Sequence, residues 1–393
     1  MFHRQLGAMP AELFQFDSRM ATGWFSDWYF PLTAETVADA LGDPIARMQV
    51  FAKKDGVLAG VYEVVRLLET QLAAHPATGR GHSLHDFRIE TLMDGDPIRP
   101  REPVMHIVGP YLAFAHLETV YLGMLARRTL VASNVRRVIE AANGKRVIAM
   151  GARHDDPRVQ TPDGWAARIG GIHGVSSHAN GAWWGASGVG TMPHAMIACF
   201  NGDVVAATRS LIRTCHARHP DVNVVSLVDY ANDVIGDSLR VATAMTEEFG
   251  RGALWGVRVD TSEMMTDRSL QGRETEFPGQ RLNGVCAPLV RELRAALDAA
   301  GFPEIRIGVS GGFTPAKIHS FEAAGVPVDF YGVGSSLLGH NNGEVDGLLN
   351  AFDFTADIVA IDGRAESKAG RERRDNDRFI TVDVPTVLAG GHR

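Results

Sequence analysis

The segment Val309-Ser310-Gly311-Gly312-Phe313-Thr314-Pro315 follows an apolar β-type run and precedes a helical pattern that extends to Ala324. Its two glycines let the backbone turn its amide groups toward a ligand, while Thr314 and Pro315 are typical of a helix N-cap and first helical position. Amide groups at a helix start favour a phosphate. The segment therefore predicts a strand-to-helix turn with an anion-binding loop.

Three more motifs follow β-type runs in the second half of the chain. They read Gly190-Thr191-Met192-Pro193-His194, Val257-Arg258-Val259-Asp260-Thr261 and Tyr331-Gly332-Val333-Gly334-Ser335-Ser336. An α/β barrel gathers its active site at the C-terminal ends of its parallel strands, so these motifs are expected to converge. The last motif repeats the glycine design of the first segment one strand later. Two successive glycine loops favour a sugar-phosphate site, although tight strand-to-helix turns also use glycine.

The glycine loops are not those of dinucleotide or nucleotide sites. The run at Gly332 lacks the third glycine of Gly-x-Gly-x-x-Gly, and the chain has no Gly-Lys-Ser/Thr.

Strands and helices alternate regularly after about residue 110, which predicts a parallel sheet able to close into a barrel. The expected strands are Arg146 to Met150, Gly188 to Thr191, Val222 to Val228, Ala253 to Val259, Arg306 to Val309, Asp329 to Val333 and Asp357 to Ile361. The expected helices are Met196 to His216, Asp233 to Phe249, Cys286 to Ala300, Pro315 to Ala324 and Glu344 to Asn350, after two helices between Leu112 and Ala142.

The region before residue 110 reads as a mixed α+β unit. Helical periodicity covers Thr33 to Leu41 and Val57 to Leu72, and strand-like runs cover Ser83 to Met93 and Pro103 to Val108. A last strand-like run, Phe379 to Val384, is expected to return to this first unit.

Composition is typical of a soluble globular protein. The 393 residues are 45% hydrophobic and 22% charged, and the net charge of −7 argues against a nucleic-acid footprint. No run approaches the roughly 20 apolar residues that span a bilayer, and Met1 to Gly7 lacks the apolar stretch of a signal peptide. Three cysteines without Cys-x-x-Cys spacing support neither a disulfide framework nor a thiolate zinc site. We expect a soluble, cytoplasmic protein with no membrane partner.

Carboxylates and guanidinium groups follow several of the expected strands. Asp229 and Asp260 would lie at the mouth of the barrel, where they can hold Mg²⁺, or bind ribose hydroxyls and support positive charge at a reacting carbon. The alternative for each is a buried carboxylate that caps a helix. Arg153 and Arg258 suit carboxylate or phosphate ligands, and the alternative is a salt bridge on the barrel rim.

His194 stands at an expected strand-to-helix junction, where a histidine can act as base, acid or phosphate acceptor. A lone histidine is more often structural, so this interpretation depends on the neighbouring motifs. His173, His178 and His194 do not have the tight spacing of zinc ligands.

The chain resembles the nicotinate phosphoribosyltransferases. These belong to the type II phosphoribosyltransferase group, which also includes nicotinamide and quinolinate enzymes, and the resemblance is greatest to the shorter branch. It runs from about Ser26 to Gly370. It depends on Ser26-Asp27-Trp28-Tyr29, Met150-Gly151-Ala152-Arg153, Ile169-Gly170-Gly171 through Ser176, Gly190 through His194, Gly256 through Thr261 and both glycine motifs.

The resemblance implies an irregular α/β barrel joined to an α/β sandwich domain. The sandwich would comprise residues 1–110 with 362–393 returning to it, and the barrel residues 111–361. Tyr29 matches an aromatic residue that reaches the pyridine ring from the neighbouring subunit, which implies a homodimer with shared active sites, or a larger homo-oligomer.

The resemblance also implies roles for individual residues. His194 matches the histidine that ATP phosphorylates, and Asp260 is the expected catalytic carboxylate. Arg153, Arg258 and Asp229 are expected around the pyridine and ribose. Ser176 falls where the family separates nicotinate from nicotinamide. The 5′-phosphate is expected on Ser310, Gly311, Gly312, Gly334 and Ser335. The expected substrates are nicotinate, phosphoribosyl pyrophosphate and ATP, with Mg²⁺ accompanying the last two.

The chain departs from the family pattern at three places. His154 stands where many members have a second arginine, and Asp260-Thr261-Ser262-Glu263 replaces the Asp-Ser-Gly-Asp of longer members. Some shorter relatives end in a cysteine-rich metal knuckle, whereas this tail has no cysteine, so we expect no structural zinc.

Three other functions stay open at this point. A quinolinate phosphoribosyltransferase shares the fold and the product but releases CO₂ and uses no ATP; the Gly-Thr-x-x-His motif counts against it. A barrel isomerase or aldolase would explain both glycine loops, but it would need a lysine or glutamate at a strand end. A catalytically silent ligand-binding relative is favoured only by His154 and the altered segment after Asp260.

Overall fold

The computed structural model describes residues 13–72, 81–190, 192–340 and 347–382. Contacts divide the chain into two compact units. The first unit comprises residues 1–136, 165–171 and 349–393, and the second comprises residues 137–164 and 172–348.

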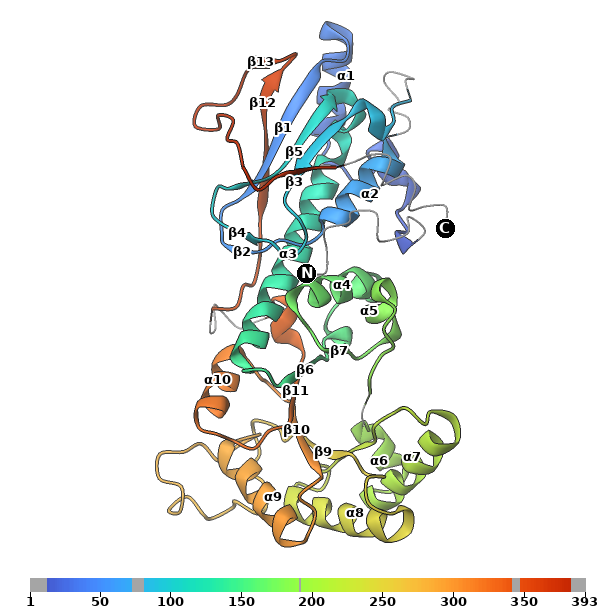
Figure 1. Ribbon diagram of the computed structural model, residues 1–393, viewed down its shortest axis with the longest axis vertical. Helices are drawn as coiled ribbons and strands as arrows, with labels where there is room; N and C mark the ends of the chain where they lie inside the picture. The colour runs from blue at the N-terminus through green and yellow to red at the C-terminus, as the bar shows by residue number, and fades with distance from the viewer. Residues whose placement is uncertain (1–12, 73–80, 191, 341–346, 383–393) are drawn as a thin grey trace. The chain divides into compact units, whose positions relative to one another are not determined.

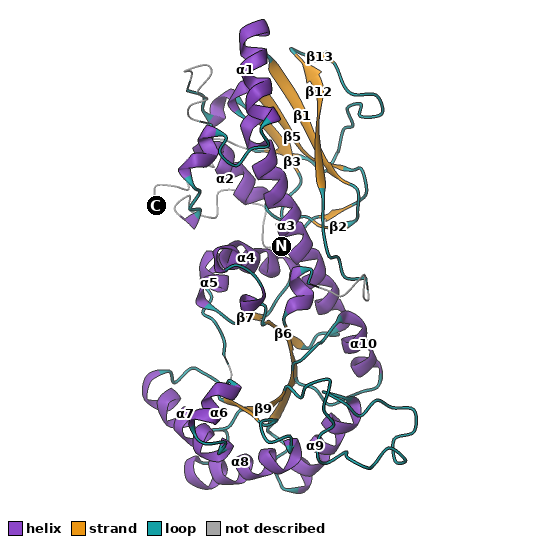
Figure 2. Ribbon diagram, turned by 180° about the vertical axis from the view of Figure 1, so that it is seen from behind, coloured by secondary structure: helices purple, strands orange, loops and turns teal. Residues whose placement is uncertain are grey.

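The first unit contains an antiparallel sheet in the order β13-β12-β1-β5-β3-β14, and helices lie on one face of it (Figures 1 and 2). Its strands are β1 (Ile45–Ala52), β3 (Arg88–Thr91), β5 (Pro103–Pro110), β12 (Phe354–Ile361), β13 (Arg364–Ala365) and β14 (Ile380–Thr381). A separate pair joins β2 (Gly56–Val57) to β4 (Pro97–Ile98). The helices are α1 (Tyr29–Leu41), α2 (Val61–Gln71) and α3 (Glu118–Ala141), of which α3 continues into the second unit.

The second unit contains a parallel sheet in the order β7-β6-β11-β10-β9-β8. Its strands are β6 (Arg146–Ala149), β7 (Gly174–Val175), β8 (Val225–Leu227), β9 (Gly256–Val259), β10 (Arg306–Val309) and β11 (Phe330–Val333). Figure 2 shows this sheet curling like part of a barrel wall, with helices outside it. Its α-helices are α5 (His178–Gly181), α6 (His194–Cys199), α7 (Val204–Arg218), α8 (Val234–Phe249), α9 (Ala287–Ala299) and α10 (Pro315–Ala323). The helix α4 (Gln160–Gly170) is divided between the two units, with residues 165–170 in the first.

The connections include short 3-10 helices. Their bounds are Ser18–Thr22, Leu84–Asp86, Tyr111–Ala113, Ala115–Leu117, Ala152–His154, Pro157–Val159, Ala182–Trp184 and Ser335–Leu338. The expected α/β fold with an irregular barrel is confirmed, and the barrel wall is a curled sheet of βα units.

One expected helix is two helices in the structure. The run Met196 to His216 is interrupted between α6 and α7, where Asn201 and Gly202 have φ angles of 55° and 84°. Left-handed backbone ends a helix. Asp203 then starts α7 by accepting a hydrogen bond from the Ala206 amide at 2.9 Å.

After residue 110, two expected helices are replaced by one long helix. The two helices expected between Leu112 and Ala142 are two 3-10 turns followed by the single 24-residue helix α3. The helix expected from Val57 begins only at Val61, because Val57 pairs in β2 and Gly60 adopts a φ angle of 99° before the first turn.

The expected strand Gly188 to Thr191 is wrong for its described part. Gly188–Gly190 is an irregular segment whose Val189 amide donates to the Val175 carbonyl at 2.7 Å, and Thr191 lies outside the described residues. The strand at this edge of the sheet is β7, which the sequence pattern did not indicate. Of the helix expected at Glu344 to Asn350, residues 344–346 lie outside the described residues and 347–350 are not helical.

The structure divides the chain at different places from the expected boundaries. Residues 111–136 and 349–361 belong with the first unit rather than with the barrel. The run Asp357 to Ile361, expected as a barrel strand, is part of β12, and Asp357 pairs with Gln49 of β1 in the antiparallel sheet. The expected return of the tail is confirmed at β14, where Ile380 pairs with Thr91 of β3.

The described helices include none that is both long enough and apolar enough to cross a membrane. The three cysteines Cys199, Cys215 and Cys286 are free thiols.

Glu118 predicts a pH dependence of stability. Burial, reinforced by the charges of Asp357 and Asp27, raises its pKa from 4.5 to about 8. The folded protein therefore holds this proton more tightly than the unfolded chain. The stabilising contribution is fully present below about pH 4.5 and is lost as the pH rises toward about 8. Glu118→Gln, which is neutral throughout, should flatten this part of the stability profile in urea titrations at several pH values. An unchanged slope would contradict the assignment to Glu118.

Candidate active site

The carboxyl ends of the six parallel strands in the second unit carry most of the expected site residues. Since the strands are parallel, these ends share one edge of the sheet. The residues that follow the strands are Arg153 after β6, Ser176 after β7, Asp229 after β8, Asp260 after β9, Ser310-Gly311-Gly312 after β10 and Gly334-Ser335 after β11. These residues therefore lie along one edge of the parallel sheet, as the sequence motifs predicted.

Arg258, Asp260 and Ser310 form a hydrogen-bonded group between β9 and β10. The Ser310 hydroxyl donates to Asp260 Oδ1 at 2.7 Å, and Arg258 Nη1 donates to Ser310 Oγ at 3.3 Å. Arg258 Nη2 also donates to the carbonyl of Met192 at 3.2 Å, which ties the strand to the segment before His194. The guanidinium is thus held between the Ser310 hydroxyl and a backbone carbonyl.

His194 is the first residue of α6, and its ring faces Asp229. His194 Nε2 lies 3.2 Å from each carboxylate oxygen of Asp229. The Asp229 side chain is only 5% exposed, while that of His194 is 46% exposed. A buried carboxylate thus orients a ring whose other side is open to a ligand. Tyr230 adds an aromatic ring 6.4 Å from the His194 ring.

Electrostatic coupling connects the two groups. Burial raises the pKa of Asp229; the proximity of His194 lowers it in part, and the charge of Asp260 raises it further. Burial lowers the pKa of Arg258, whereas the charges of Asp260 and Asp229 raise it and that of Arg153 lowers it again. Mutual effects of this kind place Asp229, Asp260, Arg258 and Arg153 in one electrostatic site.

The first glycine loop has the geometry expected from its sequence. Gly311 and Gly312 have φ angles of 87° and 64°, which side-chain-bearing residues rarely adopt. A Cβ on Gly311 would lie 3.2 Å from Asp260 Oδ1, so the loop runs directly against the carboxylate. Thr314 caps α10 by accepting from the Lys317 amide at 3.3 Å, and Pro315 occupies the first helical position.

Lys317 contacts the first glycine loop, and the sequence interpretation did not single it out. Its Nζ donates to the Gly311 carbonyl at 3.3 Å and lies 4.3 Å from the centre of the Phe313 ring. Burial lowers its pKa, and the charge of Glu263 opposes that change. The signal was present, since a residue three positions after the N-cap lies in the first helical turn beside the loop.

Glu263 also lies against this loop. A Cβ on Gly312 would come within 2.4 Å of Glu263 Oε1. Glu263 thus supplies an acidic group near the position where longer family members have their second aspartate. The altered segment after Asp260 therefore keeps a carboxylate beside the first glycine loop.

The second glycine loop lies against His154, the residue that replaces the second arginine of many family members. A Cβ on Gly334 would lie 2.9 Å from His154 Cε1 and 3.2 Å from the Met150 carbonyl. His154 Nδ1 is buried without a hydrogen-bond partner among the described residues. The ring therefore presents an unused polar atom next to a loop expected to bind phosphate.

Three expected site residues make no direct contact described above with the other site residues. Arg153 is exposed on a 3-10 helix and acts on Arg258 through its charge. Ser176 is half-buried directly after β7. Tyr29 belongs to α1 of the first unit, is 59% exposed, and its hydroxyl donates to Asp27 at 3.3 Å.

Within the described ranges, no group of three or more histidine, cysteine, aspartate or glutamate side chains is arranged to hold a metal ion. Asp229 and Asp260 provide carboxylate oxygens on neighbouring strands, which suits a hard cation bound jointly with a phosphate ligand.

Comparisons with known proteins match this chain to phosphoribosyltransferases. A sequence profile of the quinolinate phosphoribosyl transferase N-terminal domain matches residues 27–129. A nicotinate phosphoribosyltransferase of Mycobacterium tuberculosis is 28% identical over 348 residues, which cover 82% of this chain and 70% of that protein. One of Bacillus subtilis is 25% identical over 254 residues, covering 63% of this chain and 45% of that protein.

Solved structures show the same fold. Nicotinate-nucleotide pyrophosphorylase from Pyrococcus furiosus matches with a TM-score of 0.72 and 26% identity, over 94% of this chain and 85% of that chain. Human nicotinic acid phosphoribosyltransferase matches with a TM-score of 0.61 and 18% identity, over 87% and 75% of the two chains. The chain is therefore an enzyme with the fold of these solved structures, and nicotinate phosphoribosyltransferases are its sequence relatives over most of its length.

Proposed function

We propose that this enzyme is an ATP-linked nicotinate phosphoribosyltransferase that makes nicotinate mononucleotide for NAD synthesis. The observation that carries the proposal is the pairing of His194 with the buried Asp229 beside the group formed by Arg258, Asp260 and Ser310. A sugar-phosphate site needs the second group, while ATP coupling needs an oriented histidine as well.

Phosphoribosyl pyrophosphate would place its 5′-phosphate on the two glycine loops. The amides of Gly311 and Gly312 and the start of α10 favour an anion, and the ammonium group of Lys317 adds positive charge. Gly334 and Ser335 would contribute the second loop. Ser310 links this phosphate site to Asp260 through its hydroxyl.

The chemical step exchanges one bond for another at the anomeric carbon. The ring nitrogen of nicotinate forms a bond to this carbon, while the carbon–oxygen bond to pyrophosphate breaks and its electron pair leaves with pyrophosphate. Positive charge develops on the sugar, and the carboxylate of Asp260 stabilises it. Mg²⁺ bound with phosphoribosyl pyrophosphate would neutralise the departing charge, with Asp229 and Asp260 as its candidate protein donors.

The hydrogen bond to Asp229 assigns the two nitrogens of His194 different roles. A carboxylate only accepts, so Nε2 carries the proton and Nδ1 keeps its lone pair. Nδ1 would attack the terminal phosphorus of ATP and release ADP. Hydrolysis of the resulting phosphohistidine would then couple ATP use to mononucleotide formation.

Nicotinate recognition would combine charge and stacking. Arg153 offers an exposed guanidinium for the carboxylate of nicotinate, and Ser176 offers a hydroxyl. Tyr29 would stack on the pyridine ring from a second copy of the chain. The exposure of Trp24, Trp28 and Tyr29, each more than half exposed, supports a homodimer that covers them. The free thiols support a cytoplasmic location, where thiols stay reduced.

A quinolinate phosphoribosyltransferase is the second candidate, favoured by the profile that matches residues 27–129. A product assay separates the two. Nicotinate, nicotinamide and quinolinate are each supplied with phosphoribosyl pyrophosphate, with and without ATP. We expect mononucleotide and pyrophosphate from nicotinate, with stimulation by ATP. Release of CO₂ from quinolinate without any need for ATP would establish the second candidate, and no product from any substrate would overturn both.

A change at the first glycine loop tests the phosphate site. Gly311→Val adds a branched side chain at a φ angle of 87°, within 3.2 Å of Asp260 Oδ1, and should displace the loop. The apparent KM for phosphoribosyl pyrophosphate should rise more than that for nicotinate. The matched control is Gly325→Val, at a φ angle of 61° with open space around it. Equal effects on both KM values would remove the loop from phosphate binding.

Ser176→Asp tests substrate choice. Nicotinate is an anion at neutral pH and nicotinamide is not, so an added carboxylate beside the pyridine should repel only nicotinate. Its kcat/KM should fall by roughly 1–3 kcal/mol of transition-state stabilisation, with nicotinamide little affected. Ser176→Asn serves as the uncharged control. An unchanged ratio of the two kcat/KM values would exclude Ser176 from selectivity, and a wild-type preference for nicotinamide would overturn the substrate assignment.

A further inference from the structure

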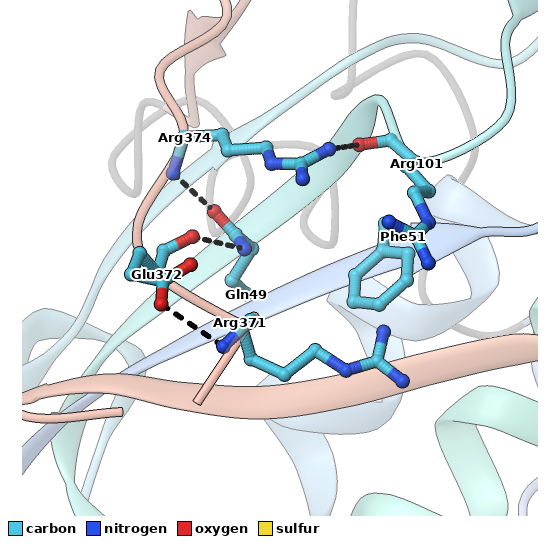
Figure 3. A pocket seen from close by; sticks show the side chains of 7 residues that line it. Gln49, Phe51, Arg101, Arg371, Glu372 and Arg374 are labelled. Atoms are coloured by element: carbon cyan, nitrogen blue, oxygen red, sulfur yellow. Dashed lines mark hydrogen bonds between the residues drawn. The ribbon is translucent and has the colours of Figure 1, made fainter. Parts of the chain in front are cut away.

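The first unit contains a small pocket whose wall is rich in arginine. The space in it and in front of it, open solvent included, totals about 240 Å³. Its lining includes Gln49, Phe51, Arg101, Arg371, Glu372 and Arg374 (Figure 3). Gln49 and Phe51 are alternate residues of β1 and therefore share one face of the strand. The remaining lining residues come from the turn before β5 and from the segment that follows β13.

A buried amide holds that segment in place. Gln49 is only 2% exposed, and its Oε1 accepts a hydrogen bond from the Arg374 amide at 2.8 Å. Its Nε2 donates to the Glu372 carbonyl at 3.5 Å. The arginines of this segment are thus presented from backbone that is anchored to the sheet.

Two of the three arginines have hydrogen-bond or ion-pair partners within the protein, and the third has none among the described residues. Arg371 Nε lies 3.6 Å from Asp357 Oδ2, and Arg374 Nη1 donates to the Arg101 carbonyl at 3.2 Å. The Arg101 guanidinium has no hydrogen bond or ion pair with any residue that the structure describes. Figure 3 shows the Arg101 and Arg371 guanidinium groups turned toward the Phe51 ring, and Arg371 lies 5.0 Å from its centre.

The charge around the pocket is positive. Three guanidinium groups face two carboxylates, those of Glu372 and Asp357, which leaves one positive charge in excess. The Glu372 carboxylate also accepts the Gly370 amide at 2.9 Å, and its backbone hydrogen bonds lower its pKa, so it stays charged and engaged.

The backbone at Arg101 is unusual for its residue type. Arg101 has a φ angle of 64°, a conformation that glycine or asparagine adopts more readily. Its amide donates to the Ala52 carbonyl at 2.6 Å, at the end of β1. Arg101 is exposed, and this strained backbone sets its unpaired guanidinium at the edge of the pocket.

We propose that this pocket binds the phosphate group of a small phosphoanion, at a site separate from the strand edge of the second unit. Guanidinium groups bind phosphate oxygens through paired N–H donors, and the pocket brings together three of them. The ligand would join Arg101 to the segment around Arg371 and Arg374. Inorganic phosphate, pyrophosphate and the terminal phosphates of ATP share this chemistry.

Calorimetric titration of the full chain tests the proposal and separates these sources. Phosphate, pyrophosphate and ATP are titrated at constant ionic strength, with nicotinate as an anion that carries no phosphate. The titrations are repeated in Gly311→Val, which is expected to weaken the 5′-phosphate site proposed for the second unit. We expect at least one phosphoanion to bind in that background with a stoichiometry of one per chain, and the order of affinities identifies its source.

Variants then locate the binding. Arg101→Asn removes the guanidinium but keeps a residue that tolerates the left-handed backbone, and Arg374→Gln removes a second one. Each should weaken binding at least about tenfold. Arg373→Gln is the matched control, because it removes one positive charge from the same segment but Arg373 pairs with Asp375 and does not line the pocket. Thermal unfolding checks that each variant folds, and Arg101→Asn carries the test if Arg374→Gln does not.

Three results would overturn the proposal. They are the absence of phosphoanion binding in the Gly311→Val background, an equal loss in Arg373→Gln, and unchanged binding in Arg101→Asn. A change of oligomeric state in Arg101→Asn without phosphoanion binding would assign the guanidinium to a contact between copies. The product assay for the proposed function depends on none of these titrations, so the two can fail independently.

Discussion

The His194→Ala variant is expected to lose nicotinate-dependent ATP hydrolysis and the stimulation of mononucleotide synthesis by ATP. Alanine removes the ring that faces Asp229, and with it the lone pair of Nδ1 that would attack ATP. Basal synthesis without ATP should persist, because Arg258, Asp260 and Ser310 are unchanged. The measurements are ADP release and mononucleotide formation, each with and without the other substrate present.

The orientation of the ring gives a second, graded test. Asp229→Asn keeps the size of the side chain but replaces the carboxylate that fixes the proton on Nε2, so ATP hydrolysis should fall steeply without vanishing. His219→Ala, an exposed histidine just after α7, is the matched control and should change neither reaction. Full ATP stimulation in His194→Ala would exclude the phosphohistidine, and an acid-labile phosphate label that survives the substitution would exclude it independently.

The parts of the fold that were predicted correctly have strong local signals. The strands β9, β10 and β11 are short and mostly apolar, and they are followed by Asp260, by Ser310-Gly311 and by Gly334. The helix α10 begins with a threonine cap and a proline. Such signals depend only on neighbouring residues. The C-terminal ends of the strands could therefore be read before the sheet was known.

The parts that were missed depend on distant partners. β1 contains Arg47 and Gln49 among its apolar residues, which obscures its pattern, and its partner β12 lies about 300 residues later in the chain. Asp357 to Ile361 was assigned to the barrel for the same reason, because nothing local distinguishes a strand of one sheet from a strand of another. The break after α6 depends on Asn201 and Gly202, which helical periodicity alone does not weigh.

The candidate site divides in the same way. The sequence pattern placed Asp260 and Ser310 at strand ends, but their direct hydrogen bond follows from the adjacency of β9 and β10. Lys317 was missed because its role depends on the return of its side chain to the Gly311 carbonyl. The pairing of His194 with Asp229 could not be predicted either, because Gly188–Gly190, which was expected to be a strand before His194, is irregular in the structure.

The second large effect is expected for Asp260→Asn. Asparagine preserves the shape of the side chain and an oxygen that can accept from Ser310, so the hydrogen-bonded group with Arg258 should stay assembled. What it removes is the negative charge that would face the anomeric carbon as pyrophosphate leaves. Loss of one preorganised electrostatic partner lowers kcat by about 10²- to 10³-fold, while KM for nicotinate should change little.

The split between kcat and KM decides what Asp260 does. A carboxylate that served only to hold Ser310 and the loop at Gly311 would raise KM for phosphoribosyl pyrophosphate when replaced, and Ser310→Ala should then reproduce the effect. A carboxylate that stabilises charge in the transition state lowers kcat alone, and Ser310→Ala should not match it. Asp298→Asn, an exposed carboxylate paired with Arg294 on α9, controls for the loss of one charge. If kcat survives in Asp260→Asn, the charge must be stabilised from elsewhere, and Asp229 is then the carboxylate to replace next.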